Sequence, residues 1–451
     1  MNSNTKDNLP MTDIIAVLHI LEQSSMDKTA LRRLTVIAVA LLTMTGRVTM
    51  LGISRWAGDG GSYRTIQRFF NSKIIWHEIL VICVQYWFAD ADDIFLFAGD
   101  ETIVTKAGKQ THGLDRFYSS IMGKPVPGLA FLAFSLISVK RSQSYIIRME
   151  QLTKEESSQA KKKKKSKKKS KKKGKPGRPK GSKNKNRRDV ELSPHLKHVQ
   201  TLIKRTLTLL TMAGIHITWF VFDGAFGNND ALQMVRQCGL HMISKMRYDS
   251  ALYFPYTGSD KRRKYGAKLD YGKIPYQYIQ SNTVDKGIRT IVYQMTMWHK
   301  LFPDKLNIVI IQKINIQTKK RVHVVLFSSD LELSHDLVVR YYRLRFQIEF
   351  NFRAAKQFWG LEDFMNVGER PVYNAANLSV FMVNLSQVII NAMRKRIPGF
   401  GVTDLKAHYR GQKYVEEMLK LLPQMPEQVL IDLLFAEIGE LGSINKSASY
   451  S

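Results

Sequence analysis

From about residue 94 the hydrophobic pattern of the chain changes from the period of helices to that of strands. Residues 11–80 carry apolar side chains at helical spacing, whereas Ile94–Gly99 is a continuous apolar run that ends in Asp100. A second predicted strand, which starts at Ile215, ends in Asp223. The chain is therefore predicted to be an α/β protein with two carboxylates at strand ends, where the sites of such sheets gather. Taken singly, each Asp can also be a turn former.

A third carboxylate lies in a stripe of cationic and phenolic residues nearer the C-terminus. Tyr342, Arg345, Arg353 and Lys356 are seven before, four before, four after and seven after Glu349. These positions share one face of a single long helix, which we expect here. A carboxylate can hold a divalent metal, and cations with a phenol can bind phosphates. Glu349 can alternatively be a surface ion-pair partner, and Arg353 can either bind phosphate or pair with Glu349.

The charge balance indicates a polyanionic partner. The 451 residues include 69 Lys and Arg against 38 Asp and Glu, a net charge of +31. Residues 161–188 carry 18 positive charges and no acid, which leaves +13 on the rest of the chain. Double-stranded DNA is the expected partner, because neutralising phosphates releases counterions. A basic surface that serves only solubility is the alternative.

Other features of the composition favour a reduced, cytoplasmic protein without a membrane partner. The two cysteines have unrelated contexts and neither metal-site nor disulfide spacing. The N-terminus shows no secretory pattern, and the longest apolar runs reach 11 residues, too short to span a bilayer.

A helix–turn–helix-like segment near the N-terminus is one candidate for DNA contact. Met50–Trp56 is predicted to be a short helix, followed by a glycine-rich turn and a second helix, Tyr63–Asn71, capped by Ser62. Arg64 and Arg68 on the second helix would contact DNA. The alternative is an ordinary helical bundle with surface arginines.

The end of the Lys-rich insert is a second candidate for DNA contact. Residues 175–183 resemble an AT-hook, in which Arg178 would enter the narrow A·T minor groove and flanking residues such as Lys180 would hold phosphates. A Lys-rich linker that binds phosphates without specificity is the alternative.

The stripe and the two strand-end carboxylates together resemble the YREK signature of prokaryotic insertion-sequence transposases, which have a DDE, RNase H-like catalytic core. All four signature residues have the family's spacing: Tyr342, Arg345, Glu349 and Lys356. The sequences GDET around Asp100 and FDGAF around Asp223 are similar to the family's first and second aspartate blocks. The resemblance covers residues 90–360.

The resemblance implies cut-and-paste DNA transposition of an insertion sequence at terminal inverted repeats. Asp100, Asp223 and Glu349 would hold two Mg²⁺ ions, or Mn²⁺ in their place, and the cations and phenol of the signature would contact phosphates at the transposon end. Hydrolysis would free one strand, its 3′-hydroxyl would form a hairpin, and the reopened end would attack target DNA. Because relatives act as dimers, a homodimer associated with the prokaryotic nucleoid is expected.

Two further residues enter through the resemblance. In some relatives a Trp of the insertion stacks near a flipped base, which makes Trp298 a candidate; a core Trp is the alternative. Glu101 adjoins Asp100, and because neighbours in a strand face opposite ways only one of them should coordinate metal; Asp100 is chosen for its sequence block.

The expected fold is α/β: an RNase H-like mixed sheet flanked by helices, with a β-rich insertion and an N-terminal helical DNA-binding domain. The parts expected along the chain are a helical domain (1–90), three parts of the catalytic core (91–153, 191–247 and 333–400), a disordered Lys-rich insert (154–190), a β-rich insertion (248–332) and a C-terminal helical tail (401–451). Two other functions remain open: a catalytically inactive DNA-binding protein derived from this fold, and an RNase H-like nuclease without strand transfer.

Overall fold

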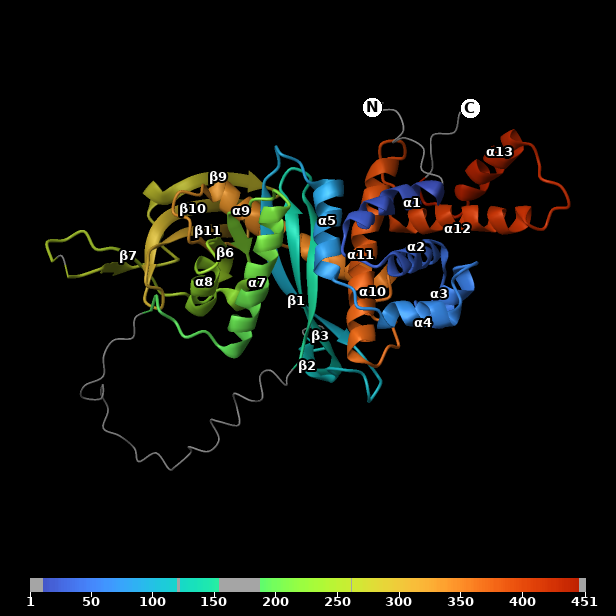
Figure 1. The fold of residues 1–451 in the computed structure, drawn as a ribbon. Helices are drawn as coiled ribbons and strands as arrows, with labels where there is room; N and C mark the ends of the chain where they lie inside the picture. Colours follow the sequence, from blue (N-terminus) through green and yellow to red (C-terminus); the bar gives the residue numbers. More distant parts are fainter. Residues whose placement is uncertain (1–10, 120–121, 154–186, 261, 446–451) are drawn as a thin grey trace, which may run out of the picture.

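The structure, a computed structural model, describes residues 11–119, 122–153, 187–260 and 262–445. The AT-hook-like segment with Arg178 and Lys180 lies outside the described residues. One large mixed sheet stands between layers of helices (Figure 1), which confirms the predicted α/β class.

The sheet has twelve strands in the order β2-β3-β1-β5-β6-β12-β11-β10-β7-β8, with β4 beside β3 and β9 beside β10. β1 is antiparallel to β3 and parallel to β5, which makes the sheet mixed. The strands are β1 (Phe95–Thr105), β2 (Asp115–Ser119), β3 (Lys124–Ser138), β4 (Gln143–Leu152), β5 (Trp219–Val221), β6 (His241–Met246), β7 (Leu252–Pro255), β8 (Tyr265–Lys268), β9 (Ile279–Asp285), β10 (Ile288–His299), β11 (Leu306–Asn315) and β12 (Arg321–Ser328).

The strands of the β-rich segment continue this same sheet. β12 pairs antiparallel with β6, from Val325 opposite Met246 to Ser328 opposite Ile243. β11 and β10 follow outward, and the β7–β8 hairpin projects from the far edge (Figure 1). The β-rich segment is therefore hydrogen-bonded to β6. β6 is the neighbour of β5, the strand that precedes Asp223.

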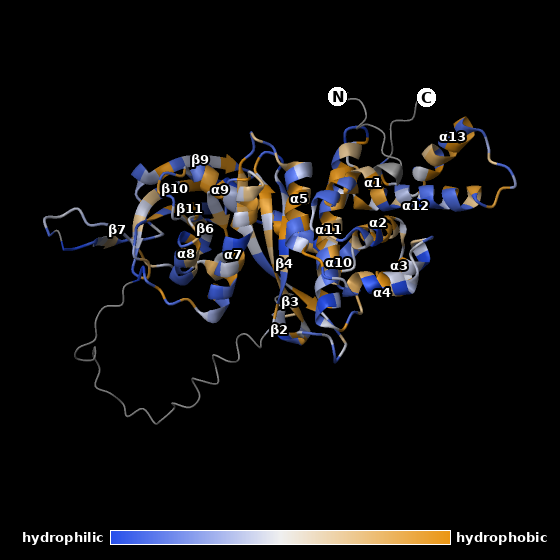
Figure 2. Ribbon diagram, in the orientation of Figure 1, coloured by the Kyte–Doolittle hydropathy of each residue, from blue (hydrophilic) through white to orange (hydrophobic). Residues whose placement is uncertain are grey.

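Helices cover both faces of the sheet. At the N-terminal end are α1 (Met11–Leu18), η1 (His19–Gln23), α2 (Lys28–Thr43), α3 (Met50–Trp56), α4 (Tyr63–Asn71) and α5 (Trp76–Phe88). The others are α7 (Pro194–Met212), η2 (Gly224–Phe226), α8 (Asn229–Arg236), η3 (Tyr276–Tyr278), α9 (His335–Leu344), α10 (Gln347–Phe358), α11 (Glu369–Met393), α12 (Val402–Leu419) and α13 (Gln428–Gly439). Figure 2 shows apolar residues along the sheet and on the helices around it.

Strand alternation in β1 decides which residues meet which helices. Phe95 and Phe97 enter a core that also contains side chains of α7 and α8. Leu96 and Ala98 enter a different core, with side chains of α9. Since side chains two residues apart share a face, Asp100 continues the face of Leu96 and Ala98, toward α9 and α10.

A third core joins the N-terminal helices to α10 and α11. It contains Leu34 of α2, Phe69 of α4 and Trp76 of α5 together with Phe352 of α10 and Phe381 of α11. The aromatic pairs Phe69–Trp76 and Trp76–Phe381 link these helices, with ring centroids 6.3 and 6.0 Å apart. The N-terminal helices therefore share a continuous interior with the helices that carry and support the stripe.

α11 is the central helix of this core. It is long and apolar enough to cross a membrane by composition, but 72% of its apolar window is buried inside the protein. Its buried Asn384 makes two hydrogen bonds with the backbone of Ile146, at 2.7 and 3.2 Å, beside a register shift between β3 and β4. A buried amide is stable only with such partners, so this contact fixes α11 against the sheet.

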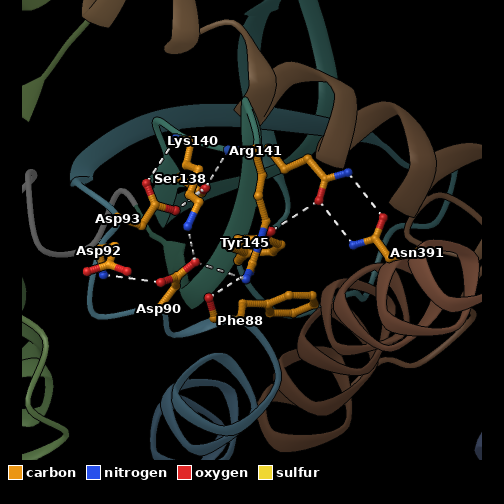
Figure 3. Close-up of polar contacts among 10 residues, drawn as sticks. Phe88, Asp90, Asp92, Asp93, Ser138, Lys140, Arg141, Tyr145 and Asn391 are labelled. Carbon is orange, nitrogen blue, oxygen red and sulfur yellow. Dashed lines mark hydrogen bonds and ion pairs between the residues drawn. The ribbon is translucent and has the colours of Figure 1, made fainter. Parts of the chain in front are cut away.

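The start of β1 is anchored by a polar network (Figure 3). Asp93 accepts hydrogen bonds from Ser138 Oγ and from the backbone amide of Lys140. Lys140 also pairs with Asp90 at 2.9 Å, and Arg141 donates to the carbonyl of Phe88 at 2.7 Å. The network ties the α5–β1 connection to the β3–β4 turn and so fixes the position of the strand that carries Asp100.

Candidate active site

The stripe lies on two helices, so the prediction of one long helix is wrong. α9 ends at Leu344 and α10 begins at Gln347, with Arg345 at the junction. The amides of Ile348 and Glu349 donate to carbonyls three residues back, as in a 3₁₀ turn. Side-chain spacing could not reveal this break, because positions three and four apart share a face in either case.

Arg345 joins two of the three predicted carboxylates. Its Nη1 donates to Oδ2 of Asp100 at 3.2 Å, and its Nη2 donates to Oε1 of Glu349 at 2.8 Å. The Arg345 side chain is 12% exposed, so these contacts are partly shielded from water and stronger than at the surface. Arg345 Nε is buried with no hydrogen-bond partner among the described residues. The guanidinium therefore holds the carboxylates of β1 and α10 together.

The pKa of Asp100 indicates that several carboxylates lie close together. Burial raises the pKa of this carboxyl to about 6, although the neighbouring Arg345 and the amide of Glu101 act to lower it. The negative charges of Asp223 and Glu349 raise it further. Nearby negative charges oppose ionisation of a carboxyl. Because Asp223 and Glu349 both raise the pKa of Asp100, both are close enough to Asp100 to interact with it electrostatically.

Asp223 lies two residues after the end of β5 and is the N-cap of the short helix η2. Its Oδ1 accepts a hydrogen bond from the amide of Ala225 at 3.0 Å, and its carbonyl accepts one from Ser244 Oγ of β6 at 2.7 Å. β5 is parallel to β1, and their pairing ends at Ala98 opposite Val221, two residues before each aspartate. Both aspartates therefore lie at the level of the carboxyl-terminal end of β5, although Asp100 is in the middle of β1 and not at its predicted end. This is the edge where sites in α/β sheets form.

A cavity of about 910 Å³ opens beside Asp223. It also contacts Tyr342 and Arg345 of the stripe. The described residues that line it are Asp223, Gly224, Ala225, Lys245, Met246, Arg247, Tyr248, Arg321, Val322, His323, Val324, Val325, Tyr342 and Arg345. Asp223 is the single carboxylate in this set, which includes four Lys or Arg side chains, so most of the cavity suits an anion.

The cations Lys245, Arg247 and Arg321 were missed by the sequence reasoning. β6 runs parallel to β5, so Lys245 and Arg247 at its end lie at the same edge as Asp223. Pairing of β12 with β6 then brings Arg321 to the cavity. The Lys-Met-Arg sequence at the end of β6 was a usable signal; the position of Arg321 depends on a strand pairing that the sequence does not display.

The other stripe residues occupy distinct positions. Burial raises the pKa of Tyr342, which keeps its hydroxyl protonated and able to donate. Lys356 donates to the carbonyl of Ile103 in β1 at 2.8 Å. Arg353 is exposed and lies over the ring of Phe350, 5.2 Å from its centroid, while the ion pair of Glu349 is with Arg345.

Glu101 faces away from this cluster. Its carboxylate lies 3.3 Å from Nε2 of His195 at the start of α7. Asp100 and Glu101 thus face opposite sides of β1, as strand alternation requires. The geometry is consistent with the choice of Asp100 as the site residue.

Trp298 and the two arginines of α4 lie away from the carboxylates. Trp298 of β10 is not among the described lining residues of the 910 Å³ cavity, and Lys264 and Lys305 lie 5.5 and 5.9 Å from its ring centroid. Arg64 and Arg68 are exposed on α4, whose apolar side is buried. The N-cap predicted for this helix is present, since Ser62 Oγ accepts from the amide of Thr65.

Comparison with known families decides the relationship of the chain. Residues 21–300 match the sequence profile of the DDE superfamily endonucleases, which is more than half of the chain. The chain belongs to this family. The residues that match the DDE superfamily profile include Asp100 and Asp223 and end before Glu349.

Comparisons with curated proteins and with solved structures do not extend this assignment. No curated protein matches the chain. Among solved structures, the DDE superfamily chain is similar to one described as a cryo-EM structure of the piggyBac transposase synaptic complex with hairpin DNA, with 12% sequence identity and a TM-score of 0.37. That match covers 98% of this chain and 84% of the other.

DDE superfamily endonucleases use divalent metal ions, and the donor set here suits one. Carboxylate oxygens are the ligands that Mg²⁺ prefers. Asp100 and Glu349 share the Arg345 guanidinium as their countercharge, and Asp223 is close enough to raise the pKa of Asp100. Within the described ranges, however, no group of three or more His, Cys, Asp or Glu side chains is arranged to hold an ion as it stands. The residues fit a metal by chemistry, on condition that Arg345 releases the oxygens of Asp100 and Glu349.

Proposed function

We propose that this DDE superfamily member is a transposase that moves a prokaryotic insertion sequence by cutting and joining DNA at terminal inverted repeats. The observation that carries the proposal is the convergence of Asp100 and Glu349 on Arg345, with Asp223 within electrostatic reach and lining a cation-rich cavity. Membership of an endonuclease superfamily supports cleavage of phosphodiesters. The basic charge of the chain supports DNA as the substrate.

In this proposal Asp100, Asp223 and Glu349 hold two Mg²⁺ ions. Ions held by these residues would supply Lewis-acid stabilisation of the charge that develops on the phosphodiester oxygens. Arg345 passes from the carboxylates to a phosphate of the transposon end, where its planar guanidinium can make two hydrogen bonds. Tyr342 donates from its protonated hydroxyl to the same backbone, and the cations of the 910 Å³ cavity hold the adjoining phosphates.

In this proposal Lys356 positions α10 relative to β1. Its ammonium bonds to the carbonyl of Ile103 and pairs with Glu362 at 3.3 Å, which ties α10 to β1 three residues from Asp100. A phosphate of the bound end would compete with Glu362 for this ammonium. Arg353, exposed one turn after Glu349, would add a second phosphate contact.

The test uses the full-length protein and a linear duplex that carries the inverted repeats flanking its gene. With Mg²⁺, a denaturing gel is expected to show a nick, then a hairpin product, and joined products once target DNA is added. Hydrolysis without hairpin or joined products would assign a nuclease instead. Binding of the repeats with no nicking in either Mg²⁺ or Mn²⁺ would overturn the enzyme proposal in favour of a DNA-binding protein.

Deleting residues 161–188 tests the contribution of the Lys-rich insert. The deletion removes 18 positive charges, and every phosphate that the protein no longer neutralises reduces the slope of log affinity against log salt by about 0.9. We expect a lower affinity for duplex DNA and a clearly shallower slope, measured by fluorescence anisotropy between about 50 and 200 mM salt. A slope equal to that of the full chain would remove the insert from the DNA interface.

We also propose that two copies pair in the DNA complex through α13 and the segment before it. This region exposes several large apolar side chains, which on a surface can mark an interaction site: Leu421, Leu422, Met425, Val429, Leu430 and Leu433. Leu430→Glu combined with Leu433→Glu is expected to halve the mass of the DNA complex in light scattering. Val284→Glu, at an exposed apolar position of β9, is the control, and dimeric complexes of both variants would contradict the pairing surface.

A further inference from the structure

A second cavity, of about 1210 Å³, lies where the N-terminal helices meet the sheet. Its walls come from the α2–α3 connection, the loop after β1, the start of β3 and the segment after α10. Four cationic side chains line it: Arg47, Lys106, Lys109 and Lys124. We call it the basic cavity.

The acidic side chains of the basic cavity are already neutralised within the protein. Glu362 pairs with Lys356 at 3.3 Å, and Asp363 pairs with Arg47 at 3.5 Å while accepting from the amide of Val48 at 3.1 Å. Each acidic side chain of the described cavity wall therefore has a cationic partner. The wall offers its remaining cations to an external anion.

Lys106 differs in role from the two other lysines. Its Nζ donates to the carbonyls of Glu362 and Phe364 and lies 3.5 Å from the Phe364 ring centroid, so it supports the cavity floor. Lys109 and Lys124 are exposed, and among the described residues neither has an ion-pair partner. They approach the cavity from two different segments, the loop after β1 and the first residue of β3.

The position of the basic cavity relative to Asp100 is set by one strand. β1 runs without interruption from Asp100 to Thr105, a wall residue of the cavity. Five residues of strand span about 17 Å at ~3.3 Å each. Phosphates along one DNA strand are ~3.4 Å apart along the helix axis, so this distance corresponds to about five base pairs.

We propose that the basic cavity binds the sugar–phosphate backbone of duplex DNA about five base pairs from the scissile phosphate. The inference rests on the proposed function, because it takes Asp100 as the place of cleavage. Lys109 and Lys124 make the phosphate contacts, Arg47 stays paired with Asp363, and Lys106 holds the shape of the wall. The cavity thereby fixes the direction in which the duplex leaves the carboxylates.

The experiment measures binding in Ca²⁺ to duplexes that carry the terminal repeat and extend 2, 4, 6, 8 or 12 base pairs past the cleavage position, on either side in turn. The proteins are the full chain, Lys109→Ala with Lys124→Ala, and a control with Lys28→Ala and Lys395→Ala, which removes two exposed charges elsewhere. For duplexes longer than about five base pairs on one side, we expect the first variant to bind about tenfold more weakly and its salt slope to fall by about 2. For shorter duplexes on that side it should match the control.

Equal behaviour of the two variants at every length, or a weakening at Lys109 and Lys124 that does not depend on length, would overturn the inference. Normal Mg²⁺-dependent cleavage of the same duplexes by the wild type, assayed in parallel, would then leave the proposed function standing. A length-dependent weakening with no cleavage by the wild type would instead defeat the proposed function and leave a DNA-binding cavity. Circular dichroism of both variants checks that the exposed substitutions leave the fold intact.

Discussion

Asp100→Asn, Asp223→Asn and Glu349→Gln are each expected to lower end cleavage at least about 1,000-fold while leaving end binding close to normal. Each change removes a negative ligand but keeps the shape of the side chain. Metal ions at such sites contribute several kcal/mol of transition-state stabilisation, and ~1.4 kcal/mol corresponds to a factor of ten. Single-turnover cleavage with Mg²⁺ and an anisotropy titration in Ca²⁺ measure the two effects.

Glu101→Gln is the matched control for the carboxylate series. Its side chain faces His195 on the other side of β1, so cleavage should stay within a few-fold of wild type. Full cleavage by any of the three carboxylate variants would remove that residue from the site. Loss of cleavage in Glu101→Gln alone would move the site to the opposite face of the strand.

The Asp100→Asn variant should also be more stable than wild type at neutral pH. Burial raises the pKa of Asp100 to about 6 from an ordinary value of 3.8. Between these values the unfolded chain holds fewer protons than the folded one, so the free energy of unfolding of the wild type falls as pH rises from ~4 to ~6. Asparagine cannot ionise, and we expect it to stabilise the fold by about 1–3 kcal/mol at pH 7 and not below pH 4. Urea unfolding at pH 4, 5 and 7 measures this.

Arg345→Ala is expected to produce two opposite effects, slower cleavage and tighter metal binding. Loss of a guanidinium that holds a phosphate should reduce cleavage by about 100- to 1,000-fold. The same change frees Oδ2 of Asp100 and Oε1 of Glu349 and removes their shared countercharge. Without DNA, Mn²⁺ should therefore bind at least about tenfold more tightly, as measured by calorimetry.

Lys356→Ala separates these effects. Lys356 contacts Ile103 and Glu362 and neither of the bridged carboxylates, so its replacement should slow cleavage and leave Mn²⁺ affinity unchanged. Arg345→Lys keeps the charge, but an ammonium lacks the planar fork that reaches two carboxylates at once, so its Mn²⁺ affinity should fall between wild type and Arg345→Ala. Unchanged Mn²⁺ binding in Arg345→Ala would show that the guanidinium does not compete with the metal.

The boundaries of a helix could be predicted accurately where adjacent residues define its cap. The α4 boundaries and its cap at Ser62 match the structure, because an N-cap is decided by a few adjacent residues. The apolar run Ile94–Gly99 marks only the first part of β1, because Asp100 and Glu101 end the run without interrupting the pairing of β1 with β3 through Thr105. β2 could not be predicted, because its residues alternate between exposed and half-buried and carry no hydrophobic signature.

The sequence predicts the three acidic residues of the site, but not the contacts and cationic side chains around them. Asp100, Asp223 and Glu349 stand out because each has a local context that the sequence displays. The bridging contact of Arg345 depends on the angle at which α10 crosses β1, and the cationic wall depends on pairing between β12 and β6. Both are set by long-range packing, which spacing along one chain does not encode.

The interior shared by the N-terminal helices and α10–α11 fixes the position of α4 relative to the carboxylates. Phe69 beneath the arginines of α4 packs on Trp76, and Trp76 on Phe381, without an intervening linker. If α4 binds DNA as proposed, the duplex would therefore meet β1 at a fixed angle and distance. Changes to the length of the α4–α5 connection should therefore shift the nucleotide at which the cut falls.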